Sequence, residues 1–286
     1  AQASLYFGSG LFLESSGGAT ATLANFKTLL GTAAAILGQG SLATSMQRLS
    51  SGLRVNSAKD DAAGLAIAER MNAQSRGMNS AIRNANDGIS LAQVAEGALG
   101  KSADLLQRMR ELAVQSANDT NTDDDRLSLD QEFGELAKEV QRVLGGTTFN
   151  GLAVLGGDAG TQTFQVGANT GSNDSINITT TNMTTNADIT SVAGTDNAGG
   201  SRAVIDNTAD AGTIQDVIDN IDTALDTINS ERATLGASQS RFDAVVSNLQ
   251  ISIENQSAAR SRILDTDFAV ETSNLSRAQI LQQAGN

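Results

Sequence analysis

The residues that could do chemistry in this sequence are acidic, because the 286 residues include neither His nor Cys. His is the usual general base, and His and Cys are the usual ligands of zinc and other transition metals. Carboxylates remain, and they can act as a pair of catalytic acids or bind a hard cation such as Ca²⁺. The composition therefore limits the candidate chemistry to carboxylate sites.

One acidic stretch, Asp119 to Asp130, resembles the start of a calcium-binding loop. Acids or amides stand at its first, third and fifth positions, and Asp130 stands at the twelfth. Two positions depart from that loop: Asp124 stands where the sharp turn needs Gly, and Asp130 replaces a bidentate Glu. The other interpretation, which we favour, is a solvated helix break whose acids cap the next helix. Calcium binding is left open as the alternative.

A second candidate is the adjacent pair Asp60 and Asp61, which could be read as a catalytic dyad. No positioned nucleophile or base is apparent nearby. Acids in a first helical turn also complement the helix dipole, which needs no catalysis. We expect no enzyme activity, no metal and no cofactor; metal-dependent turnover by the isolated chain would support an enzyme instead.

The elements that must position these residues are long helices. From Ile214 to Ile253, positions at alternating steps of four and three are apolar in ten of twelve cases, with Arg232 and Gln239 as the exceptions. This heptad seam predicts a helix roughly 60 Å long. A stripe of that length needs partner helices of similar length. The absence of Pro from the sequence permits such helices.

Partner helices are expected earlier in the chain. A heptad begins at Leu42, a long apolar face ends near Ala117, and a shorter seam runs from Leu129 to Val143. The long face contains five glycines, for which we expect close approach of another helix: Gly64, Gly77, Gly88, Gly97 and Gly100. Three pairs have capping-box spacing and predict helix starts: Ser57 with Asp60, Thr122 with Asp125, and Thr213 with Asp216.

Between these helices the composition changes to Gly, Thr, Asn and Asp. Alternating apolar residues around Phe164 and Ile176 predict small β-hairpins. We expect 179–200 to lie on the surface. Ten Asp and a single basic residue, Arg202, stand between Gly145 and Ser230, and the formal net charge of the chain is −13. Nucleic acid is therefore excluded as a partner, since phosphate binding needs the opposite sign. No run is long enough for a transmembrane helix.

The predicted fold is mainly α: an elongated bundle of long antiparallel helices with a small, β-hairpin-rich outer region. Residues 1–40 are left unassigned, although a short helix from Ala21 to Leu37 is one option. We predict four parts after residue 40: an N-terminal helical half at 41–145, a β-rich acidic insert at 146–212, a long C-terminal helix at 213–258, and a partial C-terminal core segment at 259–286.

Several long blocks of the sequence resemble bacterial flagellins. RLSSGLRVNSAKDDAAGLAIAERM, from Arg48 to Met71, is similar to the N-terminal signature of that family. SAARSRILDTDFAVETSNLSRAQILQQAG, from Ser257 to Gly285, is similar to its C-terminal signature, and TTFNGLAVL lies between them. The resemblance covers about 42–157 and 213–286, with the blocks in the family's order.

The resemblance implies a structural subunit of the flagellar filament, used for motility. It implies export without a cleaved signal through the flagellar type III apparatus, and an extracellular location. The implied partners are other flagellin subunits, the cap, hook-associated and export proteins, and the flagellin-sensing Toll-like receptor of the host. No membrane insertion is implied. The implied contact surface for subunits or receptor comprises Gln107, Arg108, Glu111, Leu112 and Glu132.

Two departures from the family pattern concern the ends of the chain. Residues 1–40 do not look like the usual amphipathic N-terminal helix, and the sequence stops at Asn286, where flagellins continue with another helix. We therefore expect this polypeptide to polymerise poorly. The alternative function is a surface adhesin or ligand-binding module on the same scaffold, with the acidic insert as its site.

Overall fold

The computed structural model describes residue 28 and residues 39–285, with side chains up to residue 283, and divides the chain into two compact units. One unit comprises residues 73–255, and the other comprises 1–72 together with 256–286. The predicted helix at Ala21–Leu37 lies outside the described residues, apart from Thr28. The described residues of both units are mainly helical, and the strands among them form two small antiparallel pairs, as the sequence predicts.

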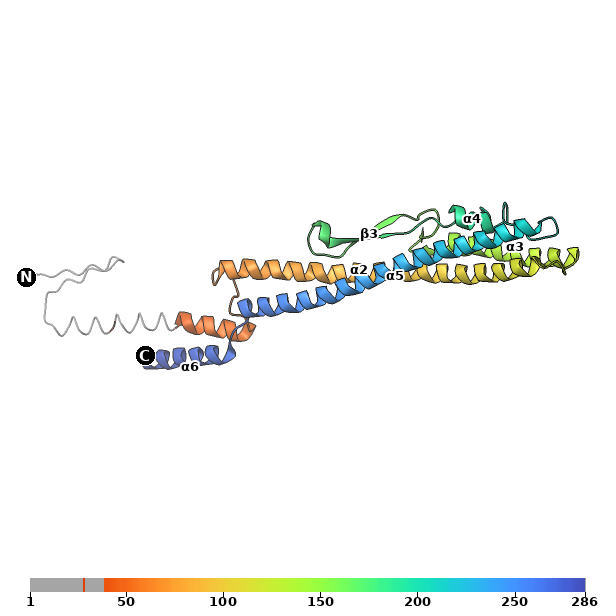
Figure 1. Ribbon diagram of the computed structural model, residues 1–286. Helices are drawn as coiled ribbons and strands as arrows, with labels where there is room; N and C mark the ends of the chain where they lie inside the picture. Colours follow the sequence, from red (N-terminus) through yellow and green to blue (C-terminus); the bar gives the residue numbers. More distant parts are fainter. Residues whose placement is uncertain (1–27, 29–38, 286) are drawn as a thin grey trace, which may run out of the picture. The chain divides into compact units, whose positions relative to one another are not determined.

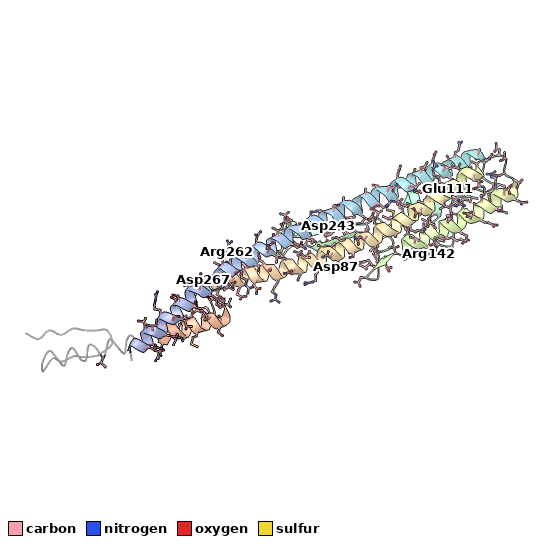
Figure 2. The ribbon with its side chains drawn as sticks, turned by 90° about the horizontal axis from the view of Figure 1, so that it is seen from below. Asp87, Glu111, Arg142, Asp243, Arg262 and Asp267 are labelled. Atoms are coloured by element: carbon pink, nitrogen blue, oxygen red, sulfur yellow. The ribbon has the colours of Figure 1, made fainter. Side chains whose placement is uncertain are left out.

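After a helix at residues 39–51, the elements follow in this order: α2 (Ala62–Ser116), α3 (Asp123–Gly146), β1 (Thr148–Phe149), β2 (Leu152–Ala153), β3 (Thr161–Gln165), the 3₁₀ turn η1 (Ser172–Asp174), β4 (Ser175–Thr179), α4 (Ala187–Ala193), α5 (Ala211–Leu264) and α6 (Phe268–Gly285). Within residues 73–255, α2, α3 and α5 run alongside one another (Figures 1 and 2). Charged side chains such as Asp87, Arg142 and Asp243 project outward from them (Figure 2).

The heptad seam of α5 is buried, which confirms the prediction. Its members spaced by seven residues are 0–1% exposed: Ile214, Ile221, Ile228, Leu235 and Phe242. The intervening Ile218, Leu225 and Val246 are partly buried against the same core. The fully buried positions alternate with half-buried ones, as expected for a helix that lies along its partner rather than inside a globule.

The partner of this seam is α2, and the two helices are antiparallel. Gly88 of α2 faces Phe242, and Arg110 of α2 contacts Asp222, so the contacts run in opposite directions along the two helices. The polar interruption at Gln239 donates a hydrogen bond to Glu96 Oε2 at 2.9 Å. The seam therefore tolerates Gln239 because its amide has a polar partner on α2.

Only one of the three predicted capping boxes begins a helix. Thr122 caps α3, with reciprocal hydrogen bonds to Asp125. The prediction at Ser57 is wrong: Asp60 accepts from Ser57 N at 2.9 Å, but α2 begins at Ala62. Asp61 Oδ1 accepts from Gly64 N at 2.8 Å. The Ser-x-x-Asp spacing there closes a turn before the helix.

The prediction at Thr213 is also wrong, because α5 begins two residues earlier, at Ala211. Asp210 Oδ1 accepts from Thr213 N at 2.7 Å and from the Thr213 hydroxyl at 2.7 Å. The residue that satisfies the free amides is therefore Asp210, since a carboxylate just before the first turn reaches them directly.

The insert contributes to the core, which corrects the expectation for 179–200. The predicted hairpin exists: β3 pairs with β4, and Phe164 stacks edge-on against Phe242 with ring centroids 5.7 Å apart. The following segment forms α4, which packs on α3 and buries Ile189, Val192 and Ala193. The buried hydrophobic residues between 176 and 205 are Ile176, Ile178, Met183, Ile189, Val192, Ala193 and Ile205. The composition of the insert did not predict their burial, because these apolar residues stand singly among Thr, Asn and Gly.

Hydrogen bonds also tie the insert to the helices. Thr181 donates to Glu231, and Thr227 donates to Asp188 Oδ2 at 2.7 Å, which joins the insert to α5. On the other side, Gln141 of α3 donates to the carbonyl of Gly194 at 2.5 Å. Near the end of α2, Ser116 donates to the carbonyl of Ile205 at 2.5 Å. These polar contacts, together with the apolar contacts of Phe164 and α4, make the insert part of the folded helical unit.

The other unit is built around a reversal of the chain at Gly52. Gly52 has φ of +71°, a left-handed conformation that favours glycine. Leu53 then pairs with Asp265, and Arg54 donates to the carbonyls of Leu264 and Ile263, at 2.6 and 2.7 Å. The segment between the helix at 39–51 and α2 is thereby held to the one between α5 and α6. In the described part of the chain, no helix combines the length and apolarity that crossing a membrane requires.

Glycines in α2 give a matched test of helix contact. An added Cβ at Gly88 would lie 2.8 Å from the Phe242 ring, whereas at Gly97 it would meet nothing within 4 Å. The expected close approach is thus present at Gly88 and absent at Gly97 and Gly100; Gly77 instead meets Ala168 of the insert.

Gly88→Ala is expected to lower the free energy of unfolding by about 1 kcal/mol, because overpacking outweighs the gain in helix propensity. Gly97→Ala is expected to raise the free energy of unfolding by about 0.5–1 kcal/mol, because no steric clash offsets the gain in helix propensity. Urea unfolding followed by circular dichroism measures both. Stabilisation by both substitutions would contradict the contact with Phe242.

Candidate functional site

Charged side chains of α2 and α3 form an exposed cluster at the predicted contact surface. Arg108 donates through Nε and Nη2 to Glu132 Oε1, at 3.0 and 2.8 Å. It also donates through Nη1 to Glu111 Oε2 at 2.9 Å. The three side chains remain between 47% and 68% exposed. The cluster is therefore ordered by its own hydrogen bonds and remains open to a partner.

The helix geometry explains why these residues meet. Arg108 and Glu111 are three residues apart on α2, so they share one face. Glu132 reaches them because α3 returns beside α2 after the short break capped by Thr122. Between the two helices, Met109 and Phe133 are fully buried. Packing of the apolar faces thus brings the polar edges of α2 and α3 together.

A groove of about 490 Å³ lies beside this cluster, lined by residues of one α2 face: Gln107, Arg110, Glu111, Val114 and Gln115. Arg110 is tied to α5, because its Nε and Nη2 donate to the two carboxylate oxygens of Asp222 at 2.6 and 3.1 Å. Val114 is 49% exposed. The groove thus combines an amide, an ordered guanidinium and an apolar side chain.

The two arginines at this surface, Arg108 and Arg110, are held in their charged form by carboxylate partners. The hydrogen bonds from Arg108 to Glu132 and then to Glu111 raise the pKa of Arg108 above its ordinary value. The hydrogen bond to Asp222 raises the pKa of Arg110 in the same direction. The arrangement offers fixed polar contacts and no group poised for proton transfer, so it suits recognition rather than catalysis.

Leu112 differs from the other four predicted residues. Its side chain is 1% exposed and belongs to the hydrophobic core. Gln107, Arg108, Glu111 and Glu132 are exposed, and they lie on α2 and α3 as described. In the folded subunit, Leu112 therefore supports the surface from beneath and does not form part of it.

Sequence reasoning missed the ion pair between Asp130 and Arg202. Arg202 Nη1 and Nη2 donate to the two carboxylate oxygens at 2.8 and 2.5 Å, and Ile205 N donates to Oδ1 at 2.9 Å. The side chain of Asp130 is 8% exposed. Gly134 makes room for the guanidinium, which would lie 2.9 Å from an added Cβ. The signal in the sequence was the lone basic residue of an acidic insert.

This pair also bears on the calcium interpretation. The carboxylate of Asp130, which would be the twelfth residue of the loop, is directed to Arg202 and Ile205. Burial alone would raise the pKa of Asp130, but the hydrogen bonds from Arg202 and Ile205 outweigh it and lower the pKa. In the described part of the chain, no three acidic side chains are grouped to hold a metal ion.

Comparison with known proteins identifies the family. Residues 31–159 match the bacterial flagellin N-terminal helical region, and residues 218–286 match the C-terminal helical region. A flagellin of Halalkalibacterium halodurans is 45% identical over 248 residues, which cover 87% of this chain and 86% of that protein. The chain belongs to the bacterial flagellin family. The family match begins at residue 31, eleven residues before the stretch that the sequence motifs had indicated.

Other flagellins are also similar to this chain. Polar flagellin A of Vibrio parahaemolyticus is 36% identical, over 84% of this chain and 88% of that protein. Flagellin A of Vibrio cholerae is 36% identical, over 86% and 89%. A crystal structure of Bacillus cereus flagellin is 32% identical with a TM-score of 0.48, and the match covers 58% of this chain and 88% of that one.

Membership of the flagellin family decides the function. The chain is a structural subunit of the bacterial flagellar filament, which assembles with other flagellin subunits. It is a structural protein and not an enzyme, as the sequence predicts. The exposed cluster around Arg108 is therefore a candidate contact surface, and the Asp130–Arg202 pair stabilises the fold of the subunit.

The ion pair between Asp130 and Arg202 gives a pH-dependent prediction. At neutral pH, Asp130→Asn is expected to lower the free energy of unfolding by about 2–3 kcal/mol, because Arg202 loses its charged partner in a largely buried site. A lowered pKa in the folded state stabilises the fold above the ordinary pKa of 3.8, and this stabilisation is lost as the pH falls below it.

Urea unfolding from pH 7 down to pH 3 tests this, with Asp222→Asn as the control at an exposed ion pair. The difference between the wild type and Asp130→Asn should shrink below pH 3.8, and the control should lose much less at pH 7. A stability difference between the wild type and Asp130→Asn that does not change with pH would contradict the stabilising role of the charged Asp130–Arg202 pair.

Proposed function

We propose that the α2–α3 surface formed by Gln107, Arg108, Glu111 and Glu132 contacts neighbouring subunits in the filament. We also propose that the flagellin-sensing Toll-like receptor of the host recognises this surface. The observation that supports both is the guanidinium of Arg108, which two carboxylates hold in place while it stays 49% exposed. An ordered arginine loses little conformational freedom on binding, and arginines are frequent among residues that dominate interfaces.

The neighbouring groove supports the same proposal. It places Val114, which is 49% exposed, within reach of the same partner. An apolar side chain beside ordered polar groups is the usual composition of a protein interface. The charges on both sides of the groove then fix the register of the contact.

The proposal of further partners is supported by membership of the flagellin family alone. We propose that the chain is exported through the flagellar type III apparatus to the outside of the cell. There it would assemble beneath the cap protein and meet the hook-associated proteins. Membership of the flagellin family supports these steps.

Arg108→Ala tests the surface, with Arg142→Ala as the matched control. Arg142 is also an exposed arginine paired with a glutamate, Glu139, but it lies farther along α3. Arg108→Ala is expected to weaken receptor-dependent signalling in reporter cells by about tenfold, because removing an ordered interface arginine often has an effect of that size. It should also lower the fraction of the chain that co-sediments with preformed flagellin filaments, a measurement that does not require the chain to polymerise by itself.

The control should retain wild-type activity in both assays. Equal activity of Arg108→Ala and Arg142→Ala in both assays would refute the proposed surface. Leu112→Ala is not a suitable test, because it opens a cavity in the core and is expected to cost about 2–5 kcal/mol of stability.

A further inference from the structure

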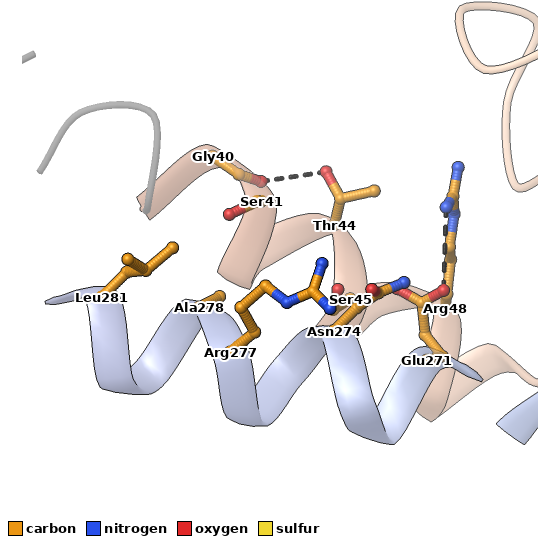
Figure 3. Close-up of a pocket in the computed structure, with 10 residues that line it drawn as sticks. All are labelled: Gly40, Ser41, Thr44, Ser45, Arg48, Glu271, Asn274, Arg277, Ala278 and Leu281. Carbon is orange, nitrogen blue, oxygen red and sulfur yellow. Dashed lines mark hydrogen bonds and ion pairs between the residues drawn. The ribbon is translucent and has the colours of Figure 1, made fainter. Parts of the chain in front are cut away.

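A second groove, of about 360 Å³, lies between the helix at residues 39–51 and α6 (Figure 3). Its walls carry hydrogen-bond donors from both helices: Ser45, Arg48, Asn274 and Arg277. All four belong to the same compact unit. The groove lies well apart in the sequence from the α2–α3 surface, and its lining chemistry is different.

Ser45 is the most deeply buried of these donors. It is 4% exposed, and it faces α6 close to Ala278, which is also 4% exposed. Ser45 lines the groove, and in the described part of the chain its hydroxyl forms no hydrogen bond and is not among the fully enclosed polar atoms. A hydroxyl that is accessible from a groove can donate a hydrogen bond to a ligand there.

The two arginines are also incompletely satisfied. Arg48 Nη1 lies 3.8 Å from Glu271 Oε2, which is an ion pair but too long for a hydrogen bond, and its Nε is buried without a partner. Arg277 makes no recorded hydrogen bond or ion pair with any described residue. Figure 3 shows its guanidinium extending across the groove toward the helix that carries Ser45.

The charge of the groove is opposite to that of the chain. Arg48 and Arg277 are positive and Glu271 is negative, so the groove keeps a net positive charge in a chain of net charge −13. A guanidinium has donors only, and the amide of Asn274 adds another donor. Converging donors with net positive charge match the oxygens of a small anion.

We propose that the groove between the helix at residues 39–51 and α6 binds a small oxyanion of the phosphate or sulfate class. Arg277 supplies the charge and Ser45 the buried hydroxyl donor, while Asn274 and Arg48 complete the donor set. The anion bridges the two helices and holds them together. A carboxylate from a second copy of the chain has similar chemistry, and the experiment separates that source from the free anion.

The test is a titration of the full-length chain with inorganic phosphate at constant ionic strength, balanced with chloride, and followed by NMR. The amides of Ser45 and Ala278 are expected to shift with saturation. Arg277→Gln should weaken the apparent affinity at least tenfold, and Ser45→Ala should weaken it by a smaller factor. Arg262→Gln is the matched control, because Arg262 is an exposed arginine of the same unit outside the groove.

Circular dichroism of each variant establishes that the helices remain folded, so that a loss of binding can be attributed to the groove. Equal affinities for the wild type and Arg277→Gln, or equal weakening by Arg262→Gln, would overturn the proposal. A dilution series without phosphate tests the alternative, in which a carboxylate from a second copy of the chain enters the groove. If the same amides respond to protein concentration and not to phosphate, the groove takes a carboxylate of a second copy and the free-anion site is refuted.

Discussion

Burial of one apolar seam determines the architecture of residues 73–255. Ile214, Ile221, Ile228, Leu235 and Phe242 lie a heptad apart on α5 and are 0–1% exposed. Their partner is the apolar face of α2, in which small residues such as Ala85, Ala92 and Gly88 allow a close approach. A chain whose aromatic content is only 3% obtains its core from this long contact instead of from bulky side chains.

The insert is part of that same core rather than an appendage to it. Its Phe164 stacks on Phe242 of the seam, and its α4 packs on α3. The pairing of Arg202 with Asp130 fixes the segment that leads from the insert to α5 against α3, with the two residues 72 positions apart in the sequence. This integration argues against the insert as an independent binding module, because its apolar residues face inward and its polar residues bind the helices.

The polar sites of the two units differ in how completely they are satisfied. On the α2–α3 surface, Arg108 has both of its carboxylate partners within the chain, which orders it for contact with a protein. In the groove at α6, Arg277 and Ser45 have no recorded partner among the described residues. A satisfied and exposed cluster suits a protein surface, whereas unsatisfied donors in a groove suit a small ligand.

The sequence by itself determined the long helices, the hairpin of β3 and β4 and the family resemblance. Helical and strand periods are local, so the spacing of residues such as Ile221 and Ile228 is enough to reveal them. Only the tertiary structure decided that Asp210 and Asp61 cap α5 and α2, that Leu112 is buried, and that α4 belongs to the core. It also decided the pairing of Asp130 with Arg202. These outcomes depend on which distant segments meet, and a one-dimensional pattern carries no information about contacts between residues so far apart in the chain.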